Sequence, residues 1–183
     1  MRIISGTARG TKLYTLEGRT TRPTLDRVKE SLFNIIQSKI QDSIFLDLFS
    51  GSGAIGLEAA SRGARKSILC DKSKDAIKII RNNTEKTHLE KKVEIFNKDF
   101  TDLLESDIKK IDIVYIDPPY KTDYIYEALK IIINNKSLEK DGLIILETDE
   151  QDRILKQIDK LRLEVIDRRK YGRAYLIFLK ELR

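Results

Sequence analysis

The central part of the chain alternates short apolar runs with longer amphipathic segments, and this rhythm limits the folds that it can adopt. Segments with helical spacing of apolar residues, such as 75–86 and 124–135, separate runs that have the length and composition of strands. These strand-like runs are residues 44–49, 67–71, 93–96, 111–117 and 142–148. Strands that are separated by helices form a parallel sheet with helices on both faces. The sequence therefore predicts a doubly wound α/β fold.

The segments that flank this region predict two additions to the sheet. After residue 160, two strand-like runs surround Gly172, which predicts an antiparallel hairpin that closes one edge. Residues 24–39 are predicted to form an amphipathic helix packed on the domain. Its apolar residues recur at helical spacing, at Val28, Leu32, Ile35, Ile36 and Ile40. We expect a seven-stranded, mostly parallel sheet within residues 41–183 and a basic N-terminal arm and helix in residues 1–40.

Composition restricts the location and the chemistry of the protein. Its 183 residues, 40% of them hydrophobic and 35% charged, are typical of a soluble domain with a substantial core. Because no apolar run approaches the roughly 20 residues of a membrane span, and the first residues lack a secretory signal, we expect a cytoplasmic protein without membrane contact. Cys70 and His88 cannot supply a Cys/His metal set, so no metal is expected. We interpret Cys70 as a small buried residue and His88 as a surface residue.

Basic residues concentrate at both ends of the chain. Residues 1–40 and residues 160–183 each contain eight Lys or Arg against three Asp or Glu, so each end carries +5. Because the formal net charge is +6, the middle of the chain carries −4. Basic ends beside an acidic centre favour contact of the ends with a polyanion, and nucleic acid is the first candidate. The alternative is that these charges form only a solvated surface.

A glycine-rich turn follows the first predicted strand. In DLFSGSGAIGLEAA, Gly51, Gly53 and Gly56 stand between a strand and a helix with the G-x-G-x-x-G spacing of nucleotide-binding turns. Asp71 lies 20 residues after Gly51, at the end of the next strand, where a carboxylate can accept hydrogen bonds from ribose hydroxyls. This pattern predicts a cofactor that contains a nucleoside. The alternative is that the glycines serve only a tight turn and close helix packing.

Acidic residues near this turn favour a cofactor without phosphates. Asp47 ends the first strand, where a carboxylate would repel a pyrophosphate but would suit the α-amino group of a methionine moiety. Asp99, after the third strand, is placed to accept a hydrogen bond from an adenine amino group. Three acids in one crevice favour S-adenosylmethionine, which carries an ammonium, a sulfonium, a ribose and an adenine but no phosphate.

The fourth predicted strand ends in the tetrapeptide DPPY, Asp117 to Tyr120. In a doubly wound sheet this position lies beside the end of the first strand, where ligands bind. The Asp117 carboxylate and the Pro118 carbonyl could hold the exocyclic amino group of a base, and Asp117 could take the proton released as a C–N bond forms. Pro118 and Pro119 would stiffen the loop, and Tyr120 could stack on the base. The alternative is a rigid turn that ends the strand, with Tyr120 in the core.

Several of these stretches resemble known motifs. DLFSGSGAIGLEAASRGA, CDKS, NKD and DPPY are similar to the cofactor and catalytic motifs of Rossmann-type amino-methyltransferases. RIISGTARGTKL, TRPTLDRVKESLFNII and KYGRAYLIF resemble more narrowly the bacterial 16S rRNA guanine-N2 methyltransferases. This resemblance, which covers nearly the whole chain, implies a Rossmann-like methyltransferase fold. It also implies methyl transfer from S-adenosylmethionine to the 2-amino group of one guanine, in 16S rRNA or in the assembled small ribosomal subunit. We expect the protein to be a monomer.

The resemblance also implies a role for particular residues. The catalytic tetrapeptide is Asp117, Pro118, Pro119 and Tyr120. The residues expected to bind the cofactor are Asp47, Ser50, Gly51, Gly53, Asp71 and Asp99. Those expected to bind RNA are Arg9, Lys12, Arg22, Arg27 and Lys29, with Arg173 on the closing turn. Tyr171, next to this turn, could line the entrance to the site or pack in the core. Phosphate contacts by these cations should weaken steeply as salt rises.

Three other functions are compatible with parts of the sequence. An adenine-N6 methyltransferase that acts on RNA or DNA could use the same tetrapeptide, because Asp117 and Pro118 can hold any exocyclic amine. An NAD(P)-dependent oxidoreductase could use the glycine turn, but the tetrapeptide would then have no role. A non-catalytic rRNA-binding protein on a methyltransferase fold should have lost cofactor acids or the tetrapeptide, and this chain retains them.

Overall fold

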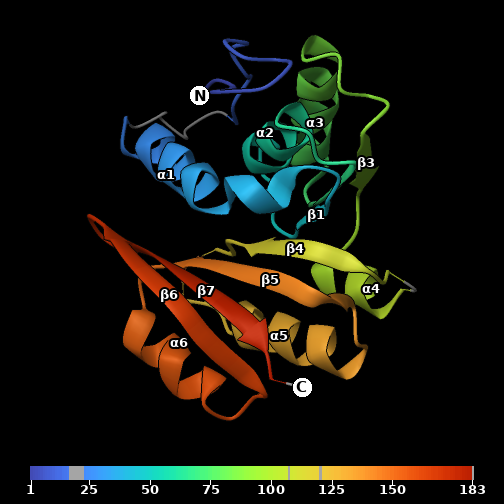
Figure 1. Ribbon diagram of the computed structural model, residues 1–183. Helices are drawn as coiled ribbons and strands as arrows, with labels where there is room; N and C mark the ends of the chain where they lie inside the picture. Colours follow the sequence, from blue (N-terminus) through green and yellow to red (C-terminus); the bar gives the residue numbers. More distant parts are fainter. Residues whose placement is uncertain (17–22, 107, 120, 183) are drawn as a thin grey trace.

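The computed structural model describes residues 1–182 except 17–22, 107 and 120 (Figure 1). For residues 23–25 only the backbone is described. Two expected site residues, Arg22 and Tyr120, therefore lie outside the described residues.

Within the described residues the chain alternates helices and strands as the sequence predicts. The helices are α1 (Pro23–Ile40), α2 (Ala54–Ser61), α3 (Lys74–Lys86), α4 (Phe100–Glu105), α5 (Tyr124–Asn134) and α6 (Gln151–Ile158). The strands are β1 (Ile44–Asp47), β2 (Lys66–Cys70), β3 (Val93–Phe96), β4 (Ile111–Ile116), β5 (Leu138–Thr148), β6 (Leu163–Tyr171) and β7 (Ala174–Glu181).

These strands form one seven-stranded sheet in the order β3-β2-β1-β4-β5-β7-β6. Strands β1 to β5 pair in parallel, and β7 pairs antiparallel with both β5 and β6. The predicted doubly wound α/β fold, with an antiparallel hairpin at one edge, is confirmed. The strand order reverses direction at β1 and β4, and the carboxyl ends of these two strands mark the edge where such sheets bind ligands.

Helices cover both faces of the sheet (Figure 1). Helices α1, α2 and α3 lie on one face, and α4, α5 and α6 lie on the other. The strands between them are almost wholly apolar, because a parallel sheet that is covered on both sides exposes little of its surface to water.

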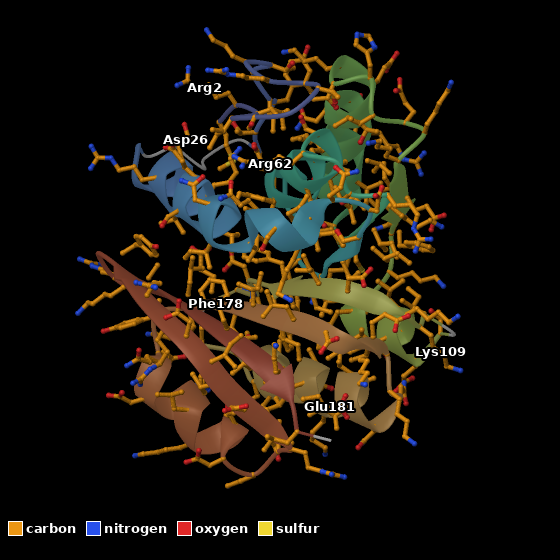
Figure 2. All side chains as sticks on the ribbon, viewed as in Figure 1. Arg2, Asp26, Arg62, Lys109, Phe178 and Glu181 are labelled. Atoms are coloured by element: carbon orange, nitrogen blue, oxygen red, sulfur yellow. The ribbon has the colours of Figure 1, made fainter. Side chains whose placement is uncertain are left out.

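Helix α1 crosses β4, β5 and β7 on its face of the sheet. Its buried side chains pack against Ile113, Ile145 and Phe178, and Phe178 is labelled in Figure 2. Of the apolar positions predicted to face the core, Ile35 is 38% exposed, so that expectation was wrong. Phe33 is fully buried instead, because it shares one helical face with the buried residues at positions 29, 36 and 40, and Ile35 lies outside that face.

The N-terminal arm, residues 1–14, folds back onto α2 and α3. Its backbone amides donate to buried side chains: Ala8 N to Ser61 Oγ at 3.0 Å and Tyr14 N to Asn83 Oδ1 at 2.7 Å. Asn83 Nδ2 donates in return to the Tyr14 carbonyl at 2.9 Å. Apolar residues of the arm, such as Ile3, join the cluster under α2 and α3. The arm is thus held by specific polar contacts as well as by apolar packing.

Candidate active site and nucleic-acid face

The glycine turn connects β1 to α2 at the ligand-binding edge of the sheet. Gly53 has φ of 79° and stands as the N-cap of α2, a left-handed conformation that glycine adopts without strain. At Gly56, an added Cβ would lie 2.7 Å from the Leu69 side chain, so the glycine lets α2 pack closely on β2. Gly51 and Gly53 also leave the turn without side chains beyond Ser50 and Ser52, so a ligand can approach its backbone.

Asp71 joins this turn to the start of α3. Its Oδ2 accepts a hydrogen bond from Gly51 N at 2.9 Å, and its Oδ1 accepts one from Ser73 N at 2.8 Å. The carboxylate is only half-buried, so its remaining lone pairs can reach a ligand. The structure therefore places Asp71 beside the glycine turn, in direct contact with Gly51.

Asp47 lies beneath the turn and not on its surface. Its side chain is 1% exposed, and its Oδ2 accepts a hydrogen bond from Gly56 N at 3.1 Å. The pKa of Asp47 is raised to about 7, mainly by burial, while the backbone hydrogen bond from Gly56 opposes the shift and the charge of Asp71 adds to it. A cation close to the turn would favour the ionised form of this carboxyl group.

Ser50 has an internal role at the same turn. Its hydroxyl donates to the Asp47 carbonyl at 2.8 Å and accepts from Cys70 N at 3.0 Å. The side chain that was expected to bind a cofactor is buried and ties the turn to the end of β2. Its structural role follows from contacts between two strands that are distant in sequence.

Asp99 caps helix α4. Its Oδ1 accepts from Thr101 N at 3.2 Å, and Lys72 Nζ lies 3.9 Å from its Oδ2. Beside it, the rings of Phe49, Phe100 and Tyr124 form a cluster with centroid separations of 5.1 to 6.1 Å. Sequence reasoning missed this cluster, since its three rings come from separate loops and helix ends.

The charges of Asp47, Asp71 and Asp99 all affect the buried thiol of Cys70. The pKa of Cys70 is raised to about 12, first by burial and then by the charges of Asp71, Asp47 and Asp99. Cys70 is fully buried, as the sequence suggested. All three acids act by their charge on Cys70, so they lie around one region at the ends of β1, β2 and β3.

Asp117 and Pro118 follow directly from β4, which pairs with β1 as predicted. Pro118 is buried, whereas Pro119 is exposed and its carbonyl accepts from Thr122 Oγ1 at 2.9 Å. Helix α6 holds the loop that follows, because Arg153 Nη2 donates to the Thr122 carbonyl at 2.6 Å. Sequence reasoning missed Arg153, which reaches this loop from a helix beyond the next strand.

Tyr115 and Glu147 form a second polar pair at the same edge. The Tyr115 hydroxyl donates to Glu147 Oε2, and the tyrosine side chain is only 3% exposed. Burial raises the pKa of Tyr115 well above its usual value, and the charges of Glu147 and Asp117 raise it further. Sequence reasoning missed Glu147, although a carboxylate near the end of the fifth strand is the same signal as Asp47 and Asp117.

The described residues that were predicted to bind RNA are exposed at two places on the surface, except for Lys29, which is buried. Arg9, Lys12, Arg27 and Arg173 are exposed. Arg9 and Lys12 belong to the arm on α2 and α3. Arg27 lies one helical turn before Ser31, whose hydroxyl is hydrogen-bonded to Tyr171 OH of the closing hairpin that carries Arg173. Tyr171 is partly buried and packs against the α1 cluster, so it links the hairpin to α1.

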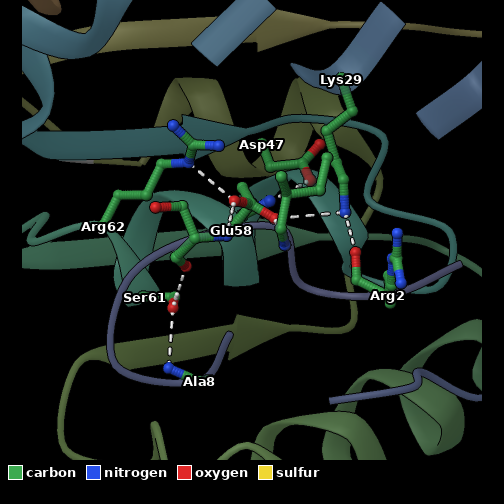
Figure 3. A network of polar contacts seen from close by, with 10 residues as sticks. Arg2, Ala8, Lys29, Asp47, Glu58, Ser61 and Arg62 are labelled. Carbon is green, nitrogen blue, oxygen red and sulfur yellow. Dashed lines mark hydrogen bonds and ion pairs between the residues drawn. The ribbon is translucent and has the colours of Figure 1, made fainter. Parts of the chain in front are cut away.

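Lys29 corrects the sequence-based expectation that it contacts RNA. Its side chain is 2% exposed, and its Nζ pairs with Glu58 at 3.2 Å and donates to the Arg2 carbonyl (Figure 3). Glu58 also accepts from Ile4 N, Ser5 N and Arg62 Nε. Burial lowers the pKa of Lys29, and Glu58 opposes that shift. The lysine therefore fastens the arm to α1 and α2 and presents no charge to the surface.

Neither a metal site nor a membrane span is found in the part of the chain that the structure describes. Its acids, Cys70 and His88 form no group of three or more potential ligands that could hold a metal ion. Among the described residues, no helix has the length and apolar character to cross a membrane. His88 is exposed in the loop after α3.

Known proteins resemble this chain over most of its length. Residues 1–180 match the family model described as Conserved hypothetical protein 95. The Haemophilus influenzae protein named Ribosomal RNA small subunit methyltransferase D is 35% identical over 152 residues, which cover 81% of this chain and 79% of that protein. The Escherichia coli K12 protein of the same name is 34% identical over 149 residues, which cover 81% of this chain and 75% of that protein.

A solved structure has the same fold as this chain over nearly its whole length. A hypothetical protein of Thermus thermophilus superposes with a TM-score of 0.79 at 26% identity, covering 97% of this chain and 98% of that chain. The likeness therefore extends over the arm, the sheet and the closing hairpin together.

Proposed function

The chain belongs to the small-subunit ribosomal RNA methyltransferase family, and from this premise we propose that it methylates the 2-amino group of a guanine in 16S rRNA, with S-adenosylmethionine as the methyl donor. The observation that carries this proposal is the position of Asp117 and Pro118, directly beside the glycine turn at the reversal of strand order. A donor held at that turn and an amine held at Asp117 would face each other across adjacent strands.

The residues around the turn fit S-adenosylmethionine better than a dinucleotide. Asp47, Asp71 and Asp99 lie around the ends of β1, β2 and β3, where all three act by their charge on Cys70. Their charge suits a ligand with a sulfonium and an ammonium group, and it would repel a pyrophosphate. Asp71 can accept from ribose hydroxyls, and the rings beside Asp99 offer a flat surface to an adenine. When bound, S-adenosylmethionine supplies an electrophilic methyl group.

The tetrapeptide loop would hold and activate the amine. The lone pair of an exocyclic amino group is delocalised into the base, which makes the nitrogen a weak nucleophile. Hydrogen bonds from its two N–H groups to the Asp117 carboxylate and the Pro118 carbonyl would orient the nitrogen and ease it towards tetrahedral geometry. As the N–C bond forms and the S–C bond breaks, Asp117 would receive the released proton directly or through water.

The RNA would reach this site across the basic surfaces. Arg27 and Arg173 lie on elements that the Ser31–Tyr171 hydrogen bond joins, and Arg9 and Lys12 extend the positive charge along the arm. Phosphate neutralisation by such residues supplies affinity without base specificity. Because the guanine must leave its stack, an unpaired or weakly stacked nucleotide is the least costly target.

Transfer of labelled methyl groups tests the proposal. The protein is incubated with labelled S-adenosylmethionine and small ribosomal subunits that lack base methylation, and the RNA is digested to nucleosides. We expect the label in N2-methylguanosine. Label in N6-methyladenosine would replace guanine by adenine as the target, and measurable donor binding without transfer to subunits, naked rRNA or DNA would overturn the proposal.

A further inference from the structure

Glu147 and Asp117 follow paired positions at the ligand-binding edge of the sheet. The parallel register pairs Ile116 of β4 with Leu146 of β5, and the residues after these two, Asp117 and Glu147, both act by their charge on Tyr115. Because side chains alternate between the two faces of a strand, Tyr115 and Asp117 point to one face, and Glu147 shares it. This is the face that α1 covers, since Tyr115 belongs to the α1 cluster.

Tyr115 fixes the orientation of the Glu147 carboxyl group. Its hydroxyl donates to Oε2 of Glu147, and its raised pKa keeps the phenol protonated as a donor. The other carboxyl oxygen, Oε1, takes no part in this bond. A partly buried carboxyl group that is held by one oxygen can present the second oxygen to a ligand in a defined direction.

Guanine carries a matching group beside its 2-amino nitrogen. Along its Watson–Crick edge, the N1–H donor is bonded to the same ring carbon as the amine. If Asp117 and the Pro118 carbonyl hold the amine, N1–H lies next to Asp117 along the edge of the base. Adenine instead has an unprotonated N1 with a lone pair at the equivalent position, next to its 6-amino group.

We propose that Glu147, positioned by Tyr115, selects guanine by accepting the N1–H hydrogen bond of the target base. This inference rests on the proposed guanine-N2 activity and adds the residue that decides between the bases. A partly buried acceptor that is held in place opposite N1–H disfavours a base that lacks this donor, because two groups with lone pairs would then face each other without a proton. The Asp117 carboxylate and the Pro118 carbonyl can hold any exocyclic amine. Discrimination between guanine and adenine therefore needs a residue outside DPPY, such as Glu147 on the neighbouring strand β5.

A target base without N1–H tests the assignment directly. The base 2-aminopurine keeps the 2-amino group, but its N1 is an acceptor. It is placed by splint ligation at the methylated position of 16S rRNA, once that position has been mapped by mass spectrometry, and the RNA is reconstituted into small subunits. Single-turnover rates on guanine and on 2-aminopurine subunits are then compared for the wild type, Glu147→Gln and Tyr115→Phe.

The expected result is a loss of the preference for guanine in Glu147→Gln. The wild type should prefer guanine by about 100-fold or more. In the variant, the amide Nε2 can donate to the bare N1 of 2-aminopurine, so the ratio of the two rates should fall by at least about 100-fold. Tyr115→Phe, which frees the carboxyl group, should lower the ratio by a smaller factor. Donor affinity should remain within a few-fold in both variants.

An unchanged ratio in Glu147→Gln would overturn the assignment. Because both rates are measured on the same preparation, partial misfolding lowers them together and leaves the ratio as it was. Failure of the proposed activity would be seen separately, as a wild-type protein that places no label on guanine in natural subunits.

Discussion

Lys29 of α1 and Glu58 of α2 form an ion pair at 3.2 Å, in which 2% of the lysine side chain and none of the glutamate side chain is exposed. The same carboxylate accepts hydrogen bonds from Ile4 N at 2.8 Å and Ser5 N at 3.0 Å. The buried carboxylate of Glu58 therefore binds both α1 and the N-terminal arm to α2. Removal of Glu58 would leave Lys29 buried without a counterion, whereas removal of Lys29 would leave Glu58 paired with Arg62 Nε at 2.7 Å.

Lys29→Ala should lower the free energy of unfolding by about 1–3 kcal/mol, because Arg62 still compensates the charge of Glu58 but Glu58 Oε2 and the Arg2 carbonyl lose their contact with the ammonium group. Urea denaturation followed by circular dichroism measures this loss. Lys39→Ala, at an exposed position in the last turn of the same helix, is the matched control and should change stability by less than about 0.5 kcal/mol. Equal effects of the two variants would contradict the structural role of Lys29.

Asp117→Ala should abolish methyl transfer while the affinity for S-adenosylmethionine stays within a few-fold. The reason is that Asp117 is assigned to the amine of the target base and not to the donor. Single-turnover transfer and isothermal titration calorimetry measure the two properties. Asp149→Ala, at an exposed acid in the loop after β5, serves as the control and should retain activity. Normal turnover by Asp117→Ala would exclude the proposed mechanism.

Arg27→Ala should weaken RNA binding and reduce the slope of log affinity against log salt concentration by about 1, as expected for one lost phosphate contact. The measurement is a titration of fluorescent 16S rRNA fragments or small subunits at several salt concentrations. Arg65→Ala is a suitable comparison, because Arg65 is exposed just before β2, at the opposite end of the strands from the site. An identical salt slope for wild type and Arg27→Ala would remove Arg27 from the RNA interface.

Asp47 should make the ligand-free protein less stable as pH rises. Its pKa is about 7 in the folded state against 3.8 as the reference, so between these values the unfolded chain binds fewer protons than the folded protein. The unfolding free energy should therefore fall from about pH 4 to about pH 7, by at most about 1.4 kcal/mol per pH unit from this group.

Asp47→Asn removes that ionisation and should become more stable relative to the wild type as pH rises, with the difference levelling off above about pH 7. Urea denaturation of both proteins across this range gives the difference at each pH. A difference that is independent of pH would mean that Asp47 does not titrate as its burial indicates.

The acids at the ends of the strands could be predicted because two local patterns place them. Alternation of strands and helices brings the carboxyl ends of parallel strands to one edge, and the sequence spacing places Asp71 at the end of the strand after the glycine turn, where it accepts a hydrogen bond from Gly51 N at 2.9 Å. The same reasoning could have found Glu147, which stands near the end of β5.

Other features depend on tertiary contacts that no local pattern contains. Lys29 lies in a basic segment, which predicts a surface cation, but its position on α1 directs its side chain towards Glu58 and the arm. Ser50 follows a cofactor-type pattern, yet its hydroxyl is used between β1 and β2. In both cases the partner comes from an element whose position depends on the completed sheet.

The docking of the arm has a consequence for the order in which the protein acquires its shape during synthesis. Residues 4–14 bind to Glu58, Ser61 and Asn83, which lie 53 to 69 residues further along the chain. Since translation proceeds from the N-terminus, the arm leaves the ribosome before its partners exist as helices. Its basic surface can therefore take its final form only after α2 and α3 have packed on the sheet, so a nascent chain that lacks these helices does not yet have the arm in its folded position.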